Sequence, residues 1–220
     1  MKDINLLFWK SNRGHGNFGD EISCFIANTL INHDSYALTF NESDAATNLI
    51  CVGSYLLMAR DDFYIYGTGV RTLDQPKSYN RLNVSAVRGP LTRDYLLARD
   101  IDCPEIYGDP ALLLSVHYSP QFIEALQDKI GIVPHLTHFQ KYSEAVLRNN
   151  FHLIDPCGEW RRVVDQIYSC KAIVSSSLHG LVCADAYNRP NLWISAPPLD
   201  EGAFKFEDYF LSQNRRVVSI

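Results

Sequence analysis

The sequence contains no hydrophobic run long enough to cross a membrane and no excess of basic residues. The apolar stretch INLLFW near the amino terminus has six residues, whereas a membrane-spanning helix needs about 20. It also lacks the flanking residues that a signal peptide requires. We therefore expect a cytoplasmic protein that binds, at most, peripherally to the inner face of the membrane. The formal net charge of -5 argues against nucleic-acid binding, because phosphate backbones are held by clustered cations.

Closely paired cysteines are also missing. The sequence has no C-x-x-C pair, and its six cysteines are scattered: Cys24, Cys51, Cys103, Cys157, Cys170 and Cys183. Most of them lie in apolar surroundings. We therefore expect buried, reduced thiols rather than disulfides or zinc ligands.

What the sequence does contain is an alternation of short apolar strands and helical segments, which is typical of parallel sheets covered by helices. The first series predicts strands near residues 4–10, 36–40, 48–53, 63–67 and 82–87, and helices near 20–32, 90–98 and 110–114. The second predicts strands at 130–134, 151–154, 171–175 and 191–195, and helices at 142–149, 159–169, 178–187 and 204–213. We therefore predict an α/β fold with two domains, residues 1–118 and 119–220.

The stretch RGHGNFGDE spaces three glycines as dinucleotide-binding loops do, between a strand and a helix: Gly14, Gly16 and Gly19. Asp20 and Glu21, however, occupy the first helical turn. There they would satisfy the positive end of the helix and repel a pyrophosphate by about a few kcal/mol. A dinucleotide-binding domain also needs an acidic residue after its second strand to bind a ribose hydroxyl. Glu42 meets this requirement only weakly, since acidic residues are common after strands. A nicotinamide oxidoreductase is therefore the least favoured interpretation.

Two other interpretations of this loop stay open. In the first, Asp20 caps the helix and the glycines permit a tight turn. In the second, Asn17 and Asp20 hydrogen-bond the hydroxyl groups of a neutral, sugar-like ligand.

The segment KAIVSSSLHG predicts an anion site. A β-rich stretch runs into Ser175, Ser176 and Ser177, and a helix then opens with Leu178 and His179. Backbone N–H groups, hydroxyls and an imidazole would converge at the carboxyl end of a strand, where open α/β sheets bind ligands. Alternatively, the serines only cap the helix and the histidine is structural.

Two cationic residues are further candidates. Arg88 follows the strand at 82–87, where its guanidinium could bind a carboxylate or phosphate, or pair with Asp94 or Asp109. Lys205 could neutralise an anion, although a solvated position on its helix is slightly favoured.

Further candidate residues lie in short motifs interpreted as strand ends: Ser54, Thr68 with Gly69, Asp109 and His135. His135 and His138 are three residues apart, but no third ligand accompanies them, so we expect no metal site.

Taken in order, several motifs together resemble the polysaccharide pyruvyl transferase family: GNFGDEIS, YGTGV, VRGPLTRDYL, YGDPALLL, KIGIVPH, SSSLHGLVCADAYNRP and FKFEDYFLS. The resemblance runs over nearly the whole chain. It implies two Rossmann-like domains facing each other across a cleft, as in the glycosyltransferase B architecture. It also implies transfer of a pyruvyl group from phosphoenolpyruvate to sugar hydroxyls, commonly as a ketal, during surface-polysaccharide synthesis.

By position, the resemblance implies donor binding by Arg88 and by the segment Ser177, Leu178 and His179. Many members have arginine where Ser177 stands, so Arg71 or Lys205 would have to supply that cation. The chain is also short for the family. The resemblance therefore does not by itself imply that the acceptor-binding loops are retained.

These observations give one working hypothesis about the site. His179 acts as the general acid/base or phosphate partner, and the serine amides form the anion cradle. Asp20 and Asn17 hold or deprotonate the acceptor, and His135 is a second base. The acceptor site extends to Ser54, Thr68 and Gly69. No redox cofactor is needed, and the saccharide acceptor could be lipid-linked.

Two other function classes stay open. One is a sugar-nucleotide glycosyltransferase of the same architecture. Such an enzyme needs an acidic residue to bind the ribose, and no clear candidate follows the strand at 191–195, although Asp200 and Glu201 are nearby. The other is a non-catalytic carbohydrate-binding relative.

Overall fold

The computed structural model describes residues 2–9, 16–42, 47–74, 78–145, 150–195 and 202–216. These residues fall into two compact units, each assembled from separate stretches of the chain. Unit 1 takes its residues from 1–9, 23–110 and 199–217, and unit 2 takes its residues from 10–22, 111–198 and 218–220. The prediction divided the chain once, between residues 118 and 119. In the structure, residues 16–22, at the start of α1, are instead grouped with the later half of the chain.

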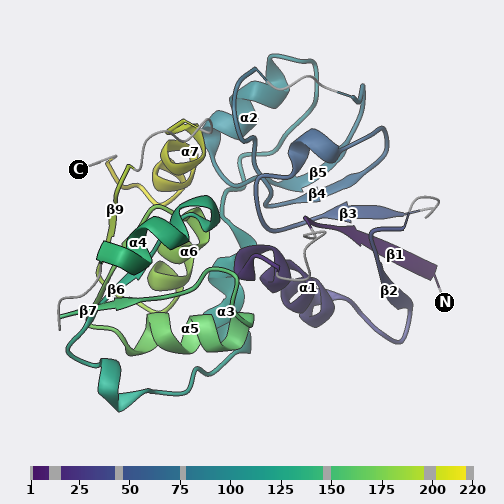
Figure 1. Ribbon diagram of the computed structural model, residues 1–220. Helices are drawn as coiled ribbons and strands as arrows, with labels where there is room; N and C mark the ends of the chain where they lie inside the picture. Colours follow the sequence, from purple (N-terminus) through teal and green to yellow (C-terminus); the bar gives the residue numbers. More distant parts are fainter. Residues whose placement is uncertain are drawn as a thin grey trace. The chain divides into compact units, whose positions relative to one another are not determined.

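Unit 1 contains a five-stranded sheet in which all neighbouring strands run parallel (Figure 1). Its strands are β1 (Lys2–Leu7), β2 (Tyr36–Phe40), β3 (Asn48–Ile50), β4 (Tyr64–Tyr66) and β5 (Asn83–Ala86). They lie in the order β2-β1-β3-β4-β5. The unit also holds most of α1 (Phe18–Leu30), with the short η1 (Leu56–Met58), α2 (Pro90–Leu97) and α7 (Phe204–Ser212).

The core of unit 1 follows from the register of its strands. Ile50 of β3 pairs with Ile65 of β4, and both side chains are almost wholly buried. Because paired residues in a parallel sheet point to the same face, they form one apolar layer, which packs with Leu96 of α2. Pro90 begins α2 as predicted, where its missing N–H costs no helical hydrogen bond. The helix α7 packs beside α2.

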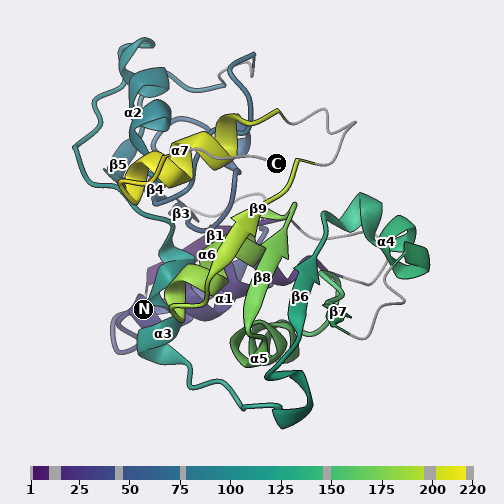
Figure 2. The same cartoon turned by 90° about the vertical axis from the view of Figure 1, so that its left-hand side faces the viewer.

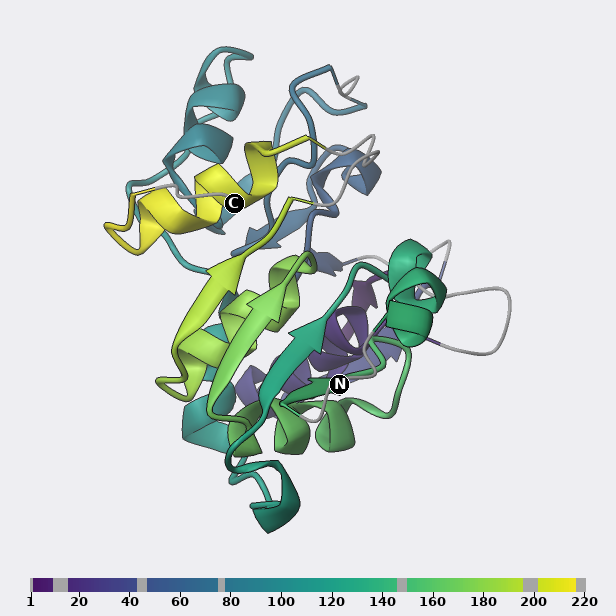
Figure 3. The ribbon, with the colours of Figure 1, turned by 60° about the vertical axis from the view of Figure 1, so that its left-hand side comes forward.

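Unit 2 contains a second parallel sheet, with four strands in the order β7-β6-β8-β9. The strands are β6 (Ile130–Val133), β7 (Phe151–Leu153), β8 (Ala172–Ser175) and β9 (Asn191–Trp193). Figures 2 and 3 show β6, β8 and β9 side by side with their arrowheads pointing the same way. The helices are α3 (Leu114–His117), α4 (Phe139–Ala145), α5 (Trp160–Ser169) and α6 (Leu178–Ala186).

Helix α6 is the central helix of unit 2. Every residue from 178 to 184 is buried, and the helix contacts both β8 and α5. A helix that is apolar on all sides is stable only when it is covered on all sides. The start of α6 is therefore held firmly by its surroundings.

The predicted α/β class with parallel sheets is confirmed, and most elements begin and end near their predicted positions. The predicted helix at 110–114 is wrong in type, because η2 (Pro110–Leu113) is a 3-10 turn that leads into α3. Strand β3 ends earlier than predicted, since the chain turns at Gly53, whose φ is 102°. The predicted helix at 142–149 begins earlier, at Phe139, and residues 146–149 lie outside the described residues.

The cysteines are free thiols, as predicted. Four of them are buried, and burial raises the pKa of both Cys103 and Cys170 to about 11. At pH 8 a thiol with such a pKa is roughly one-thousandth thiolate, and the thiolate is the reactive form.

We expect Cys103 and Cys170 to react with a disulfide reagent at pH 8 at least ~100-fold more slowly in the native protein than in urea. Time-resolved labelling followed by peptide mass spectrometry measures this for each cysteine. Rapid labelling of Cys170 in the native protein would contradict the finding that this thiol is buried.

Candidate functional site

The strand order in unit 2 reverses beside β6, which lies between β7 and β8. In open parallel sheets, ligands bind outside the carboxyl ends of the strands at such a reversal. Residues 134 and 135 follow β6, and residues 176 and 177 follow β8. The predicted anion segment therefore lies where this class of fold places its ligands.

Hydrogen bonds of the serine run shape the turn between β8 and α6. The Ser175 hydroxyl lies 2.8 Å from the carbonyl oxygens of both Val133 and Ser177, and it accepts a bond from the Ser177 N–H at 3.0 Å. The Ser176 hydroxyl accepts a bond of 2.9 Å from the N–H of His135. These two side chains therefore join the turn after β8 to the turn after β6.

Ser177 is the N-cap residue of α6, but its side chain makes no capping hydrogen bond to the described residues. The alternative that the serines simply cap the helix therefore does not describe this turn. The first N–H groups of α6 point along the helix axis at its positive end. Helix starts of this kind bind phosphate and carboxylate groups, and in this one residues 176–179 are buried.

His179 lies in the first turn of α6 and is 8% exposed. Its ring meets the ring of Phe18 edge to face, with centroids 6.5 Å apart. A Cβ atom added to Gly19 would overlap Nδ1 and Cγ of His179 and would lie 2.8 Å from its Cβ. The glycine-rich loop and the serine–histidine segment, far apart in sequence, are therefore in direct contact within unit 2.

The cap of α1 is Asn17, which corrects the interpretation of Asp20 as the capping residue. The Oδ1 atom of Asn17 accepts a hydrogen bond of 3.1 Å from the Gly19 N–H, and Asp20 lies in the first turn. Burial, with a smaller contribution from nearby Glu159, raises the pKa of Glu21. The predicted acceptor residues Asn17 and Asp20 thus lie at the same helix start that packs on His179.

His135 belongs to the same reversal point. Its Nδ1 atom lies 2.8 Å from the Thr137 hydroxyl, and its ring centroid lies 6.2 Å from that of His138. Among the described residues, no group of three or more His, Cys, Asp or Glu side chains is placed to hold a metal ion.

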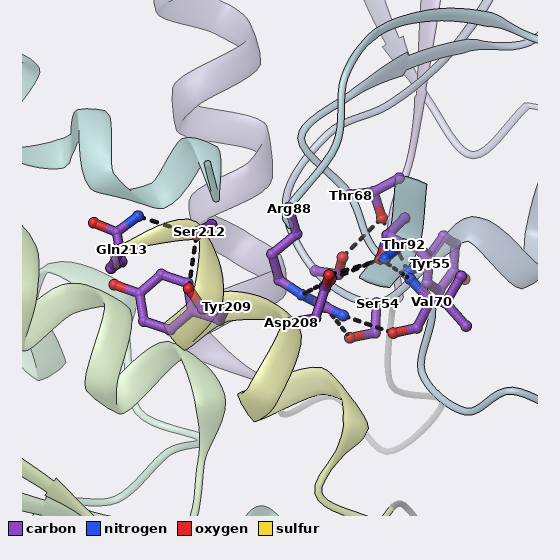
Figure 4. Close-up of polar contacts among 11 residues, drawn as sticks. Ser54, Tyr55, Thr68, Val70, Arg88, Thr92, Asp208, Tyr209, Ser212 and Gln213 are labelled. Atoms are coloured by element: carbon purple, nitrogen blue, oxygen red, sulfur yellow. Dashed lines mark hydrogen bonds and ion pairs between the residues drawn. The ribbon is translucent and has the colours of Figure 1, made fainter. Parts of the chain in front are cut away.

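The remaining predicted site residues lie in unit 1, and Figure 4 shows two of them, Ser54 and Thr68, close to Arg88. The Arg88 side chain is wholly buried and forms an ion pair with Asp208, with Nε 3.1 Å from Oδ2. It also donates bonds of 2.6 Å to the Ser54 hydroxyl and to the carbonyl oxygen of Val70. The ion-pair partner is therefore Asp208 of α7, rather than Asp94 or Asp109.

Two glycines allow this ion pair to form. A Cβ atom at Gly69 would overlap the Arg88 guanidinium, and one at Gly89 would overlap the backbone carbonyl of Asp208. Thr68 supports the same loop, because its hydroxyl donates a bond of 2.7 Å to the Gly53 carbonyl oxygen. The predicted acceptor residues Ser54, Thr68 and Gly69 thus surround Arg88.

Lys205 is 7% exposed, so the expectation that it is solvated on its helix face is wrong. Its Nζ atom lies 5.3 Å from the centre of the Phe206 ring. Arg71, the other substitute for the missing family arginine, is exposed in unit 1.

Sequence reasoning missed Asp208 and Thr92. Both oxygens of the Asp208 carboxylate accept hydrogen bonds from Thr92, one from the backbone N–H at 2.9 Å and one from the hydroxyl at 2.6 Å. The sequence does contain a signal that Asp208 is buried. This residue lies among Phe206, Tyr209 and Phe210, on the apolar side of its helix.

Comparison with known proteins identifies the family. A family model described as polysaccharide pyruvyl transferase matches residues 17–196. The chain belongs to the polysaccharide pyruvyl transferase family. In this family member, the match begins at the residue that caps α1 and extends past β9, so it includes all the strands after β1.

Two curated proteins are similar to this pyruvyl transferase family member. Protein L143 of Acanthamoeba polyphaga mimivirus is 27% identical over 205 residues, which is 88% of this chain and 69% of L143. The succinoglycan biosynthesis protein ExoV of Rhizobium meliloti (strain 1021) is 28% identical over 215 residues, which is 92% of this chain and 62% of ExoV. The chain therefore spans between three-fifths and seven-tenths of these relatives.

A solved structure shares the fold. Protein KP1_0663 of Klebsiella pneumoniae subsp. pneumoniae NTUH-K2044 superposes with a TM-score of 0.54 at 12% identity, covering 100% of this chain and 92% of that protein. Within the part of the chain that the structure describes, no helix combines the length and apolar character that a membrane crossing requires.

The buried ion pair predicts a specific pattern of stability. Asp208→Leu leaves the Arg88 guanidinium buried without its counter-charge, which costs about 3–5 kcal/mol. Arg88→Met/Asp208→Leu removes both charges, so we expect it to recover more than half of that loss. Urea denaturation followed by fluorescence measures both variants.

The control is the exposed ion pair between Arg81 and Asp62, in the same unit. Asp62→Asn should leave the urea midpoint unchanged, because exposed pairs contribute little. Equal losses in the single and double variants at positions 88 and 208 would contradict the interpretation.

Proposed function

We propose that the protein transfers a pyruvyl group from phosphoenolpyruvate to hydroxyl groups of a saccharide, forming a ketal, in surface-polysaccharide biosynthesis. The observation that carries this proposal is the arrangement in unit 2 of the α6 start, the serine turn and the His179 imidazole at the strand reversal. Membership of the polysaccharide pyruvyl transferase family supports it, and so does similarity to ExoV, whose name assigns it to succinoglycan biosynthesis.

The donor is proposed to bind at the start of α6. Phosphoenolpyruvate is a compact anion with a phosphate and a carboxylate, which suit the backbone N–H groups at the helix start and the positive end of the helix. The hydroxyls of Ser175 and Ser176 and the N–H groups of Ser176 and Ser177 already make hydrogen bonds within the two turns, so the anion cradle is assigned to the N–H groups of Leu178 and His179 instead of the serine amides. The proposal requires neither a redox cofactor nor a metal.

The chemistry proposed for His179 is proton transfer. The donor resists attack until its methylene carbon is protonated, which creates an oxocarbenium-like centre at C2. A sugar hydroxyl then attacks C2 and loses its proton to Asp20 or His135, and phosphate leaves with the electrons of its C–O bond. Loss of phosphate leaves C2 oxocarbenium-like again, and a second hydroxyl attacks it, closes the ketal and returns a proton to His179. A positioned general acid typically contributes 10²–10⁴-fold to such a step.

The finer architecture also belongs to the proposal. We propose that the two Rossmann-like units face each other in a glycosyltransferase B arrangement, as the family resemblance implies. Donor binding by Arg88 and Lys205 stays a prediction. The wholly buried Arg88 side chain already bonds to Asp208, Ser54 and Val70.

The second candidate function is that of a sugar-nucleotide glycosyltransferase. The sequence offers no clear acidic ribose ligand after β9, and the nearby Asp200 and Glu201 lie outside the described residues. We expect phosphoenolpyruvate to raise the midpoint of thermal unfolding, because a ligand at 100 times its Kd stabilises a protein by about 2.7 kcal/mol. UDP and GDP should leave the midpoint unchanged, and the reverse result would favour the glycosyltransferase.

Replacement of the proposed general acid tests catalysis. His179→Ala should lower phosphate release from phosphoenolpyruvate by at least ~100-fold with a saccharide acceptor, and leave the far-ultraviolet circular dichroism unchanged. A panel of galactose- and mannose-type acceptors supplies the assay.

His117→Ala is the matched control, because His117 is an exposed histidine in unit 2. It should retain the wild-type rate. Full activity of His179→Ala would refute the role of the imidazole. Donor binding by the wild-type protein without phosphate release on any acceptor would identify a non-catalytic carbohydrate-binding relative.

A further inference from the structure

We propose that Gly19 is a positioning residue, whose missing side chain lets the first turn of α1 close against the imidazole of His179 and fix its orientation. This inference deepens the proposed function and rests on it for the catalytic consequence. It assigns a physical role to the last glycine of the loop that resembles a dinucleotide-binding motif.

The contact itself leaves no room for a side chain. A Cβ atom at Gly19 would occupy space already filled by Nδ1 and Cγ of His179. The ring cannot rotate away freely, because it is 8% exposed and Phe18, which is wholly buried, packs against it edge to face. Any side chain at position 19 must therefore displace either the imidazole or the helix start.

The helix start is held in place from two sides. The Phe18 N–H donates a hydrogen bond of 3.0 Å to the carbonyl oxygen of Pro156, in the loop after β7. The Asn17 side chain caps the helix through the Gly19 N–H at 3.1 Å. Because these bonds hold the first turn of α1, a side chain at position 19 would displace the His179 side chain from its Cβ atom outward, and the imidazole with it.

The orientation has a chemical consequence. Since Nδ1 lies against the backbone of Gly19, the proton that His179 gives to the donor is carried on Nε2, the opposite ring nitrogen. Displacement of the ring by about 1 Å would move Nε2 away from the methylene carbon, and a misplacement of that size can cost about 100-fold in rate. Donor binding should suffer much less, because the backbone N–H groups at the start of α6 are proposed to provide it.

Gly19→Ala is the test, and Gly16→Ala is its matched control in the same loop. A Cβ atom at Gly16 would meet chiefly the carboxylate end of the Glu21 side chain, which can rotate away. We expect Gly19→Ala to lower kcat by about 100-fold with less than a threefold change in the KM for phosphoenolpyruvate. Gly16→Ala should change neither constant more than twofold.

A double-variant cycle separates an effect on the ring from general damage. Gly19→Ala should lower the thermal midpoint of the wild-type protein more than that of His179→Ala, in which the ring is gone and only the contact of the new methyl group with the Cβ atom of residue 179, at 2.8 Å, remains. In long-range proton–nitrogen spectra, the ring nitrogens of His179 should shift in Gly19→Ala and stay unchanged in Gly16→Ala.

These readouts keep the two proposals distinguishable. If wild-type protein releases no phosphate from phosphoenolpyruvate, the proposed function fails, while the spectra and the thermal cycle still decide the role of Gly19. An equal thermal loss from Gly19→Ala in both backgrounds, or unshifted ring signals, would overturn the positioning role. If Gly19→Ala fails to fold, folding of Gly19→Ala/His179→Ala supports the proposal, and failure of both contradicts it.

Discussion

The hydrogen bond from the N–H of His135 to the hydroxyl of Ser176 joins the two turns that leave β6 and β8, and the candidate site depends on it. Neighbouring parallel strands end at the same edge of a sheet, but the turns that follow them diverge unless something holds them together. Ser175 adds a second connection through the Val133 carbonyl oxygen. Because polar side chains of the turn make these connections, the start of α6 is held in a fixed position relative to the end of β6.

Unit 1 is organised around a different constraint, a buried charge that must be neutralised. Moving a guanidinium out of water costs several kcal/mol unless a counter-charge and further hydrogen-bond acceptors replace the water. Asp208, Ser54 and the Val70 carbonyl supply these for Arg88. The geometry requires close approach of the backbone at Gly69 and Gly89. The helix α7 is thereby fastened to unit 1, although it comes from the far end of the chain.

Much of the fold could be predicted because its signals are local. Short apolar runs become strands, Pro90 begins a helix, and the sequence from 172 to 179 contains a strand, a polar turn and a helix start in eight consecutive residues. The segment predicted to bind an anion therefore has the local structure that the sequence indicated. The partners of its residues could not be predicted, because the contact of Gly19 with His179 and the ion pair of Arg88 with Asp208 join distant segments. A single sequence records which residues are present, but not which distant residues meet.

The glycine-rich loop shows how the same spacing can have different physical causes. In a dinucleotide-binding loop, glycines let the backbone approach a pyrophosphate, and the helix start must remain open to the anion. Here the start of α1 is capped by Asn17, carries Asp20 and Glu21 in its first turn, and lies against an imidazole. The requirement for glycine at position 19 therefore comes from the protein's own histidine rather than from a bound cofactor. The spacing of glycines identifies only where the backbone must pack closely against another group. The charges of the neighbouring residues indicate whether that group is a bound phosphate or a side chain of the protein itself.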